Sequence, residues 1–375
     1  MNKTEYKRLG DYIREVDVRN RDLAVTRLLG VSISKEFIPS IANTIGTDMS
    51  SYKIVTRGQF AYGPVTSRNG DKVSIALFAD DVPAIISQAY TVFEISDKNR
   101  LLPEYLMMWF RRPEFDRYAR YHSHGSAREV FDWDEMCDVR LPIPPLSRQR
   151  EIVAEYETLT RRIRLNERLI ASLESLAQTL YRRTFVDNID PAHLPPGWKK
   201  VTLGDVCELY QPKTISSSEF VPKEMYDVFG TNMLYDVFGA NGVIGKYKEF
   251  NHEMSMVVVS CRGAGCGRIN RTQPKSWITG NSMVVKPKDA RVHNEFFYQV
   301  LKSLNVAATI SGSAQPQITQ ASLSSLEFIM PPIDLLSEYS CRIDESVHLR
   351  LKIQLENLTI RRIYQLLLSK ISKGL

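Results

Sequence analysis

An internal repeat is the feature of this 375-residue chain that most restricts its possible folds. The run Gly-Ser-Ala at 125–127 recurs at 312–314, and the pair Pro-Pro at 144–145 recurs at 331–332, each 187 positions later. Near the start of each repeat, Leu-Gly-Asp at 9–11 recurs at 203–205, which is 194 positions later. The ends of the two repeats therefore match while their middles differ, which predicts one scaffold that carries two different surfaces.

A long helix is expected to close each repeat, over residues 146–187 and 333–375. Each begins after the proline pair, because the fixed φ of proline suits the start of a helix. Apolar residues then recur at steps of three and four, which is typical of a coiled-coil seam, so we expect the two helices to pair. Asn166 interrupts the first apolar stripe. The predicted seam residues are Ile152, Leu159, Ile163, Leu173 and Leu180, then Ile343, Ile353, Ile360, Ile363 and Leu367.

The sequence divides into four segments: a domain over 1–145, the first long helix over 146–187, a second domain over 188–332, and the second long helix over 333–375. Residues 190–198 are rich in Pro and Gly and are typical of a linker. Strand-like runs occur at 52–56, 90–95, 255–260 and 282–286, and short helices are expected at 103–110 and 294–304. We therefore predict an α+β fold with two α/β domains in tandem repeat, each followed by a long helix.

The composition favours a cytoplasmic protein. No stretch of about 18 apolar residues occurs, and the N-terminus lacks the pattern of a secretion signal. Five scattered cysteines, an odd number, favour reduced thiols over a disulfide framework. The net charge of +6 is spread over the chain without a basic tail. A nucleic-acid partner would therefore have to be held by a shaped face or with the help of partner subunits.

Three glycine-rich stretches of the second repeat are candidate DNA-reading loops, at 238–247, 260–269 and 279–282. Asn-Gly steps also favour plain hairpin turns, and both interpretations stay open. In a duplex, Arg can pair with guanine and Asn or Gln with adenine, while Lys mostly meets phosphate. The candidate DNA contacts here and in the following stretch 312–318 are Asn241, Lys246, Arg262, Arg268, Asn281, Ser313, Gln315 and Gln317.

In the first repeat, the polar loop at 58–72 is the best candidate for reading DNA. Tyr62 is a candidate contact, although a half-buried strand aromatic is the alternative. His122 and His124 lie close together but lack an obvious third ligand, so they are interpreted as surface residues rather than metal ligands. The candidate DNA contacts are Tyr62, Arg68, Asn69, Lys72, Ser126 and Arg128.

Several kinds of chemistry find no support in the sequence. The glycines at 263, 265 and 267 are not followed by a helical pattern, which argues against a dinucleotide site. Cys261 and Cys266 lack a second pair of ligands for zinc. The chain has neither an Asn/Asp-Pro-Pro-Tyr/Phe run, which amino-methyltransferases use, nor a Walker phosphate loop. No catalytic residues and no metal ligands are predicted.

Taken together, these motifs resemble the specificity subunit of type I restriction-modification systems. The resemblance rests on the two Leu-Gly-Asp openings, on the runs at 239–245, 262–267 and 279–282, and on 312–318 leading to the proline pair. The first repeat matches less well, because Gly125-Ser126-Ala127 lacks the Gln-Pro-Gln continuation. Its run Ser87-Gln-Ala-Tyr90 before a strand looks like the family's other common type of recognition domain.

The resemblance implies that each domain is a target recognition domain for one half of a split, asymmetric site on double-stranded DNA. The helices would pair as an antiparallel coiled coil, set the spacer length and dock methyltransferase subunits. No cofactor would bind this chain, since S-adenosylmethionine, and ATP with Mg²⁺, would belong to the modification and restriction subunits. Two alternatives stay open: a self-contained DNA-modifying enzyme, and a coiled-coil scaffold that binds only proteins.

Overall fold

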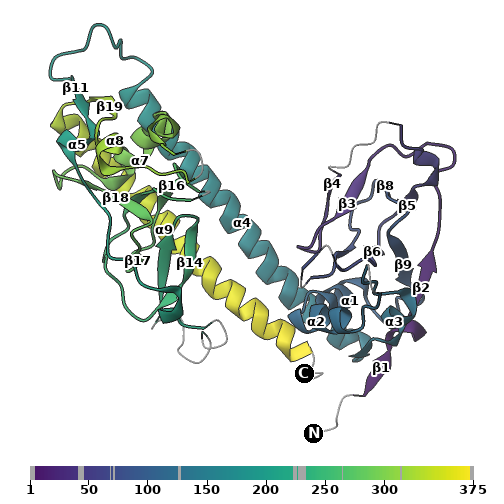
Figure 1. The fold of residues 1–375 in the computed structure, drawn as a ribbon. Coiled ribbons are helices and arrows are strands. Elements are labelled where there is room, and N and C mark those ends of the chain that lie inside the picture. Colours follow the sequence, from purple (N-terminus) through teal and green to yellow (C-terminus); the bar gives the residue numbers. More distant parts are fainter. Residues whose placement is uncertain are drawn as a thin grey trace. The chain divides into compact units, whose positions relative to one another are not determined.

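The computed structural model describes residues 5–40, 46–67, 69–70, 72–125, 128–222, 226, 234–263, 265–312 and 315–371. The chain forms two compact units, and each unit takes one part of each long helix. Unit 1 comprises Met1–Leu165 and Asn357–Leu375, and unit 2 comprises Asn166–Glu356. In Figure 1 the domain of unit 1 is purple to blue and that of unit 2 is mostly green.

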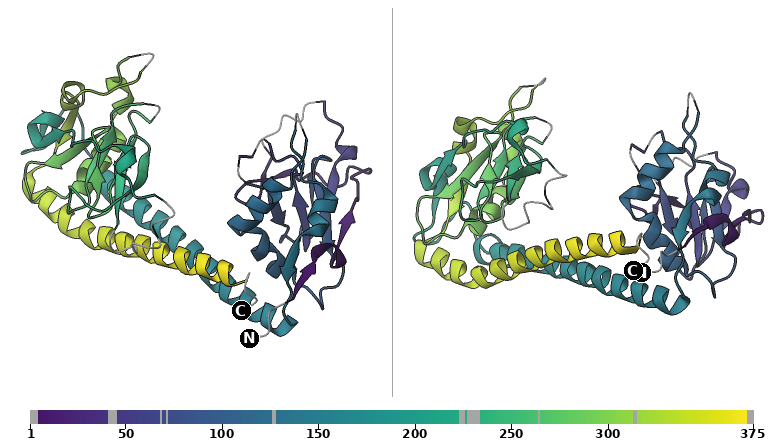
Figure 2. Two further views of the ribbon diagram at one scale, coloured as in Figure 1. Left: turned by 60° about the horizontal axis from the view of Figure 1, so that its bottom comes forward. Right: turned by 90° about the horizontal axis from the view of Figure 1, so that it is seen from below.

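The two long helices are α4, Leu146–Phe185, and α9, Ile333–Ile371, and both begin after the proline pair as predicted. In unit 1 the first turns of α4 share a core with the last turns of α9, and the hydroxyl oxygens of Tyr156 and Tyr364 lie 2.9 Å apart. In unit 2 the end of α4, at Tyr181 and Phe185, packs with Tyr339 near the start of α9. The helices are therefore antiparallel in each unit; Figure 2 draws α4 in teal and α9 in yellow.

The helix seam differs from the prediction at one position. Ile363 is 47% exposed, because the buried steps along α9 run through Ile360 and Leu368, with Tyr364 partly buried between them. Asn166, which was expected to interrupt the stripe, is only 3% exposed and occupies a seam position itself. Of the other predicted seam residues, Ile152, Ile343, Ile353 and Ile360 are buried, and Leu159, Ile163, Leu173, Leu180 and Leu367 are partly buried.

The domain of unit 1 is built on an antiparallel sheet with the order β2-β9-β6-β7. Its core stacks Phe60 of β6 on Phe93 of β9, with ring centroids 4.8 Å apart, and Phe110 of the helix α1 meets both rings edge-on. The elements are β1 Tyr6–Arg8, β2 Ile13–Val16, β3 Leu29–Val31, β4 Phe37–Pro39, β5 Lys53–Val55, β6 Gln59–Tyr62, β7 Ile75–Leu77, β8 Ala84–Ile86, β9 Thr91–Ile95, α1 Pro103–Phe110, α2 Pro113–Tyr121, α3 Trp133–Asp138 and β10 Arg140–Pro142.

The domain of unit 2 repeats this plan with the sheet order β12-β18-β15-β16. Its core holds Val257 and Val259 of β15 against Phe296 and Phe297 of α7. The elements are β11 Lys199–Thr202, α5 Leu203–Val206, β12 Cys207–Tyr210, β13 Tyr235–Gly239, β14 Gly242–Tyr247, β15 Val257–Ser260, β16 Ile269–Arg271, β17 Trp277–Ile278, β18 Ser282–Pro287, α7 Asn294–Ser303, α8 Gln320–Ser324 and β19 Glu327–Met330.

The strand registers confirm the repeat. Tyr6 pairs with Pro142 between β1 and β10, and Lys200 pairs with Ile329 between β11 and β19, which are the positions that the sequence offsets give. The strands outside the two four-stranded sheets differ between the units. Unit 1 has the pairs β3-β4 and β5-β8, whereas unit 2 has the three-stranded sheet β14-β13-β17. One scaffold thus supports two different sets of loops.

A buried charge cluster joins the domain of unit 2 to its helices. The carboxylate of Glu295 on α7 is 2% exposed and lies 2.6 Å from Arg271 and 3.7 Å from Arg350 on α9. Glu174 on α4, which is 48% exposed, lies 3.1 Å from Arg271. Because an unpaired buried charge is strongly destabilising, this cluster couples the helices to the sheet of unit 2.

Candidate nucleic-acid interface

Loop 260–268 of unit 2 connects β15 to β16 as a tight turn. Gly263 and Gly267 have φ of +75° and +85°, which L side chains rarely adopt. Gly265 has a different role, since a Cβ there would lie 2.3 Å from the carbonyl oxygen of Ala240. The three glycines therefore shape a strand-to-strand turn that packs on the β13-β14 hairpin. They do not form a strand-to-helix phosphate loop.

The other glycine-rich stretches meet this loop. The hydroxyl of Thr279 donates to the carbonyl of Phe238, 3.0 Å away, at the end of β13. The amide of Cys261 donates to the carbonyl of Asn281, 2.9 Å away. The amide of Gly280 donates to the hydroxyl of Thr214, 3.1 Å away, which adds the loop 211–214. Four segments that are far apart in the sequence thus form one surface.

The repeated Gly-Ser-Ala stretch completes this surface. Ser311 and Gln317 exchange two backbone hydrogen bonds of 2.9 Å and so pair as the two arms of a small hairpin. The hairpin is held to loop 260–268, because the amide of Gly263 donates to Pro316 at 3.2 Å and the amide of Ile318 donates to Cys261 at 3.0 Å. We call the described residues of the segments 211–214, 238–242, 260–268, 279–282 and 311–318 the unit 2 loop surface.

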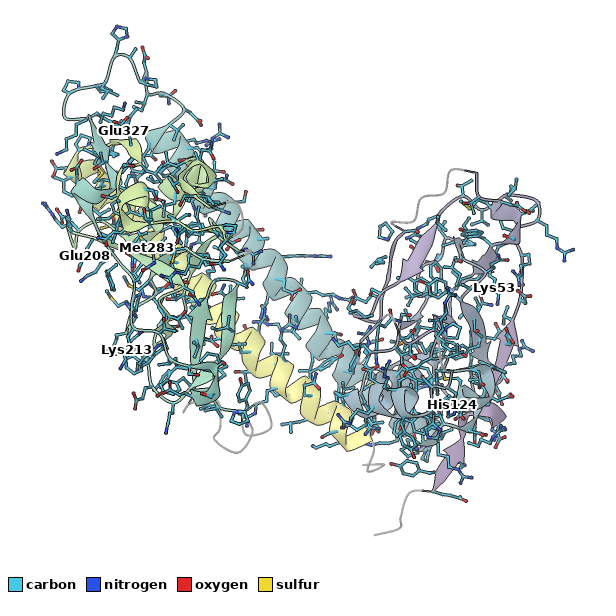
Figure 3. The ribbon with its side chains drawn as sticks, viewed as in Figure 1. Lys53, His124, Glu208, Lys213, Met283 and Glu327 are labelled. Carbon is cyan, nitrogen blue, oxygen red and sulfur yellow. The ribbon has the colours of Figure 1, made fainter. Side chains whose placement is uncertain are left out.

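The unit 2 loop surface carries positive charge and amide groups. Its five segments contain no Asp or Glu. Asn281 is partly exposed on it, and Lys213, which lies in the loop after β12, is labelled in Figure 3. Lys213 was missed by sequence reasoning, because only folding brings loop 211–214 beside Gly280. The exposed polar side chains among its described residues are Gln211, Lys213, Thr214, Asn241, Arg262, Arg268, Ser311, Gln315 and Gln317.

Lys246 does not join this surface. It pairs with Asp236 across β13 and β14, at the end of the hairpin away from the turn at 240–241. Its ammonium lies 2.7 Å from the carboxylate of Asp236, whose side chain is only 15% exposed. The structure therefore places Lys246 apart from the other candidates, in an ion pair along the strand, and its contact with DNA stays a prediction.

Unit 1 builds the same hairpin at the matching place. His124 and Val130 exchange backbone hydrogen bonds of 3.0 and 2.9 Å, each 187 positions before Ser311 and Gln317. The amide of Thr66 donates to Glu129 and the amide of Phe131 donates to Pro64, which reproduces the bonds between loop 260–268 and the hairpin of unit 2. The loop that follows β6 is therefore the unit 1 counterpart of loop 260–268.

The candidates of unit 1 fall into four groups. Lys72 and Arg128 are exposed beside this hairpin, while Asn69 is partly buried and its side-chain amide donates to the carbonyl of Val65, 3.3 Å away. Tyr62 is 0% exposed in the core beneath the loop, so its prediction as a DNA contact is wrong. Burial raises the pKa of the Tyr62 phenol. Arg68 and Ser126 lie outside the described residues, as does Ser313 of unit 2.

The histidines of unit 1 have a partner that the sequence did not reveal. His122 and His124 both face the carboxylate of Glu135, at 2.8 and 3.4 Å. His124 is labelled in Figure 3. Within the described ranges, no group of three or more His, Cys, Asp or Glu side chains is arranged to hold a metal ion.

The cysteines of the unit 2 loop surface are poorly suited to chemistry. Burial raises the pKa of the Cys261 and Cys266 thiols, which disfavours the reactive thiolate. The thiol of Cys261 instead accepts a hydrogen bond from the side chain of Gln211, 3.0 Å away. Neither thiol is therefore activated as a nucleophile.

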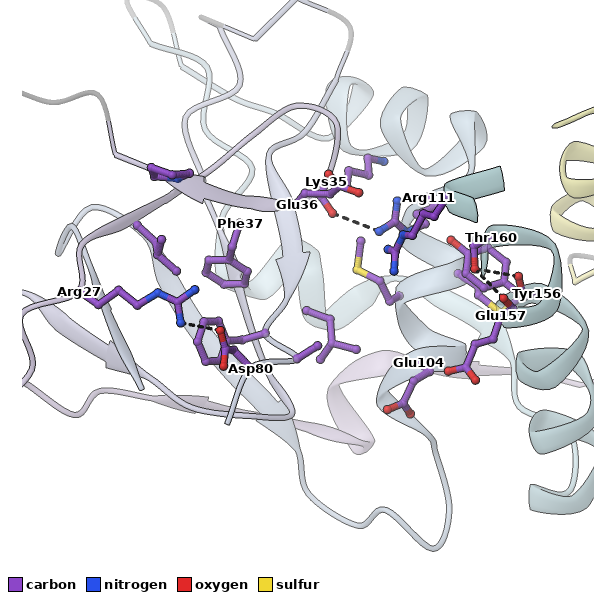
Figure 4. A pocket seen from close by; sticks show the side chains of 18 of the residues that line it. Arg27, Lys35, Glu36, Phe37, Asp80, Glu104, Arg111, Tyr156, Glu157 and Thr160 are labelled. Carbon is purple, nitrogen blue, oxygen red and sulfur yellow. Dashed lines mark hydrogen bonds and ion pairs between the residues drawn. The ribbon is translucent and has the colours of Figure 1, made fainter. Parts of the chain in front are cut away.

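Unit 1 also has a pocket of about 730 Å³ next to α1 and α4, shown in Figure 4. Its lining includes four basic and four acidic residues, and Arg27 forms an ion pair of 2.5 Å with Asp80 at one side. The charges of this pocket therefore balance, which gives it no preference for an anion.

Comparison with known families identifies one whose model matches most of the chain. A family model described as type I restriction modification DNA specificity domain matches residues 35–175 and, a second time, residues 195–335. The chain belongs to this family. Each of the two repeats contains one of the two matches to the family model.

Two relatives of this chain are named as specificity subunits of type I restriction enzymes. It is 25% identical over 140 residues to the type I restriction enzyme EcoprrI specificity subunit of Escherichia coli. It is 26% identical over 153 residues to the HindI specificity subunit of Haemophilus influenzae. The matches cover 36% and 40% of this chain, and they span 32% of the length of each relative.

The fold is similar to that of a solved structure, the S subunit of a type I restriction-modification system from M. genitalium. The TM-score is 0.64, with 15% identity, and the comparison covers 99% of this chain and 96% of that one. At this identity the likeness concerns the fold alone. Within the part of the chain that the structure describes, no helix is long and apolar enough to span a membrane.

Proposed function

We propose that this chain is the non-catalytic, sequence-specific DNA-binding subunit of a type I restriction-modification complex. The observation that carries the proposal is the hairpin at 124–130 and 311–317, which supports a different loop set in each unit through equivalent hydrogen bonds. Such an arrangement suits two readers of unlike sequences. Membership of the specificity-domain family and the names of the relatives support the same role.

In unit 2, the exposed side chains of the loop surface would read the bases. Arg262 and Arg268 can each donate two hydrogen bonds to a guanine edge, and Asn241, Gln315 or Gln317 can pair with an adenine edge. Lys213 would contact phosphate. In unit 1, Lys72 and Arg128 beside the shared hairpin would have the equivalent position, with unlike side chains and therefore an unlike target.

Each unit would thus read one half of a bipartite, asymmetric site on double-stranded DNA. The antiparallel helices would set the spacer between the halves and dock the methyltransferase subunits. S-adenosylmethionine, and ATP with Mg²⁺, would be bound by the modification subunits and by a restriction subunit. The complex would act on DNA in the cytoplasm.

A domain exchange tests this proposal. Residues 1–145 are replaced by the corresponding domain of another specificity subunit, and the methylated sites are mapped in cells that also express the modification subunit. We expect one half of the site to change and the other to remain. Changes in both halves would contradict independent readers, and a chain without DNA preference even in its complex would favour the protein-binding scaffold.

A further inference from the structure

A second hollow in unit 1, a groove of about 1010 Å³, differs from the balanced pocket in its charge. One face of α2 lines it, together with Lys72 of the candidate reading loop and part of α9. Asp116 is the single acid among its thirteen lining residues. The basic lining residues are six: Lys35, Lys72, Arg111, Arg117, Arg120 and Arg361.

The single acid of this groove is already compensated. The carboxylate of Asp116 lies 2.8 Å from the ammonium of Lys35 and accepts a hydrogen bond of 3.0 Å from the amide of Val73. Both side chains of this ion pair are nearly buried, at 12% and 6% exposure. Beyond this ion pair, the lining holds five further basic residues and no further acid.

Two arginines of α2 are suited to reach a ligand. Arg117 and Arg120 lie one helical turn apart on the lining face, and their side chains are 70% and 41% exposed. Each has a carboxylate nearby, Glu114 at 3.5 Å and Glu129 at 2.6 Å, and neither of these acids lines the groove. Exposed ion pairs of this kind contribute little stability, so both arginines can exchange them for phosphate oxygens.

The cluster belongs to one unit and not to the shared scaffold. In unit 2 the positions that match Arg117 and Arg120, 187 residues later, are Leu304 and Ala307, which carry no charge. A requirement of the common fold would place cations in both units. The arginines of α2 are therefore specific to unit 1.

We propose that this groove binds backbone phosphates of the DNA duplex next to the half-site that unit 1 reads. The inference rests on the proposed function. Lys72 joins the two regions, because it lies in the loop held by the shared hairpin and also lines the groove. Phosphate contacts of this kind fix the position of a reader on the duplex without specifying sequence.

The test compares two double variants of the full chain, each in complex with the modification subunit. Arg117→Gln/Arg120→Gln removes two charges from the groove. Arg14→Gln/Arg57→Gln is the matched control, since these arginines are 66% and 64% exposed, ion-paired and outside the groove. The Kd is measured by fluorescence anisotropy between 50 and 300 mM KCl. The probes are a duplex with the mapped site and one with both halves scrambled.

We expect the slope of log Kd against log salt to fall by about 1.8 in the groove variant, at about 0.9 per lost phosphate contact. The weakening should be equal on both duplexes, and the control variant should keep the wild-type slope. An unchanged slope in the groove variant overturns the inference. Weakened binding of the modification subunit at an unchanged DNA slope also overturns it and assigns the groove to an acidic protein surface.

The inference and the proposed function can fail separately. If the wild-type complex does not discriminate the mapped duplex from the scrambled one, the proposed function fails. The slope on the scrambled duplex still decides whether the groove binds phosphate.

Discussion

Replacing Gly265 by Ala should weaken the recognition of bases by unit 2 and leave the chain able to fold. The new Cβ would lie 2.3 Å from the carbonyl oxygen of Ala240 and 2.3 Å from the side-chain oxygen of Asn241. Real Cβ atoms essentially never come within 3.0 Å of another atom, so loop 260–268 or the β13-β14 turn must move by about 0.7 Å or more. Overpacking of this kind costs about 1–3 kcal/mol.

The displacement falls on the residues proposed to read bases. Arg262 and Arg268 flank Gly265 in the same loop, and each good bidentate base contact contributes about 1–3 kcal/mol of discrimination. We expect the variant to fold, to lose tenfold or more in discrimination at the half-site of unit 2, and to keep its preference at the other half. The assay measures the Kd for duplexes in which each half-site is scrambled in turn, together with the thermal midpoint.

Gly263→Ala is the matched control, because it makes the same change in the same loop with no atom within 4 Å of the new Cβ. Its φ of +75° should cost about 1–2 kcal/mol of backbone strain, without displacing the hairpin. If Gly265→Ala keeps full discrimination at both halves, the packing of this loop does not position the reading residues and the reasoning is refuted.

Three further predictions concern the helices and the charge cluster. Ile360→Ala should lower the free energy of unfolding by about 2–5 kcal/mol, whereas Ile363→Ala on the exposed side of α9 should stay within about 0.5 kcal/mol in urea titrations. Glu295→Ala should cost about 3–5 kcal/mol by leaving Arg271 and Arg350 without their buried partner. Glu174→Ala, at an exposed position, should cost about 1 kcal/mol or less in the same assay. Inserting one heptad into both α4 and α9 adds about 10 Å of helix and should lengthen the tolerated spacer by about three base pairs, as read from methylated sites; an unchanged spacer would exclude the helices as the ruler.

Much of the scaffold could be predicted from the sequence, because its signals are local or repeated. The proline pairs mark the starts of α4 and α9, and the offset of 187 residues places both hairpins. The prediction failed at Ile363, which is exposed although it is apolar and lies three residues after the buried Ile360. The sequence alone does not distinguish an apolar residue on the seam from one beside it.

The loop surface was harder to predict because it depends on contacts between distant segments. Lys213 is brought to Gly280 only by the pairing of β12 with β18, and Lys246 is turned aside by Asp236 on the neighbouring strand. Tyr62 lies in β6, whose four residues are all buried. The sequence did not reveal this burial, because the strand lies in a stretch rich in polar residues. Arg117 and Arg120 have no motif around them, and only the fold brings them together with Lys72 on the lining of one groove.

The central claim is that two units read two unlike sequences. The most direct test maps methylated sites in the DNA of cells that express the full chain with its modification subunit, beside cells in which Arg262 and Arg268 are both changed to Gln. The account predicts a split, asymmetric motif for the wild-type chain and relaxed sequence in one half only for the variant. Methylation without a sequence motif, or relaxation of both halves together, would contradict it.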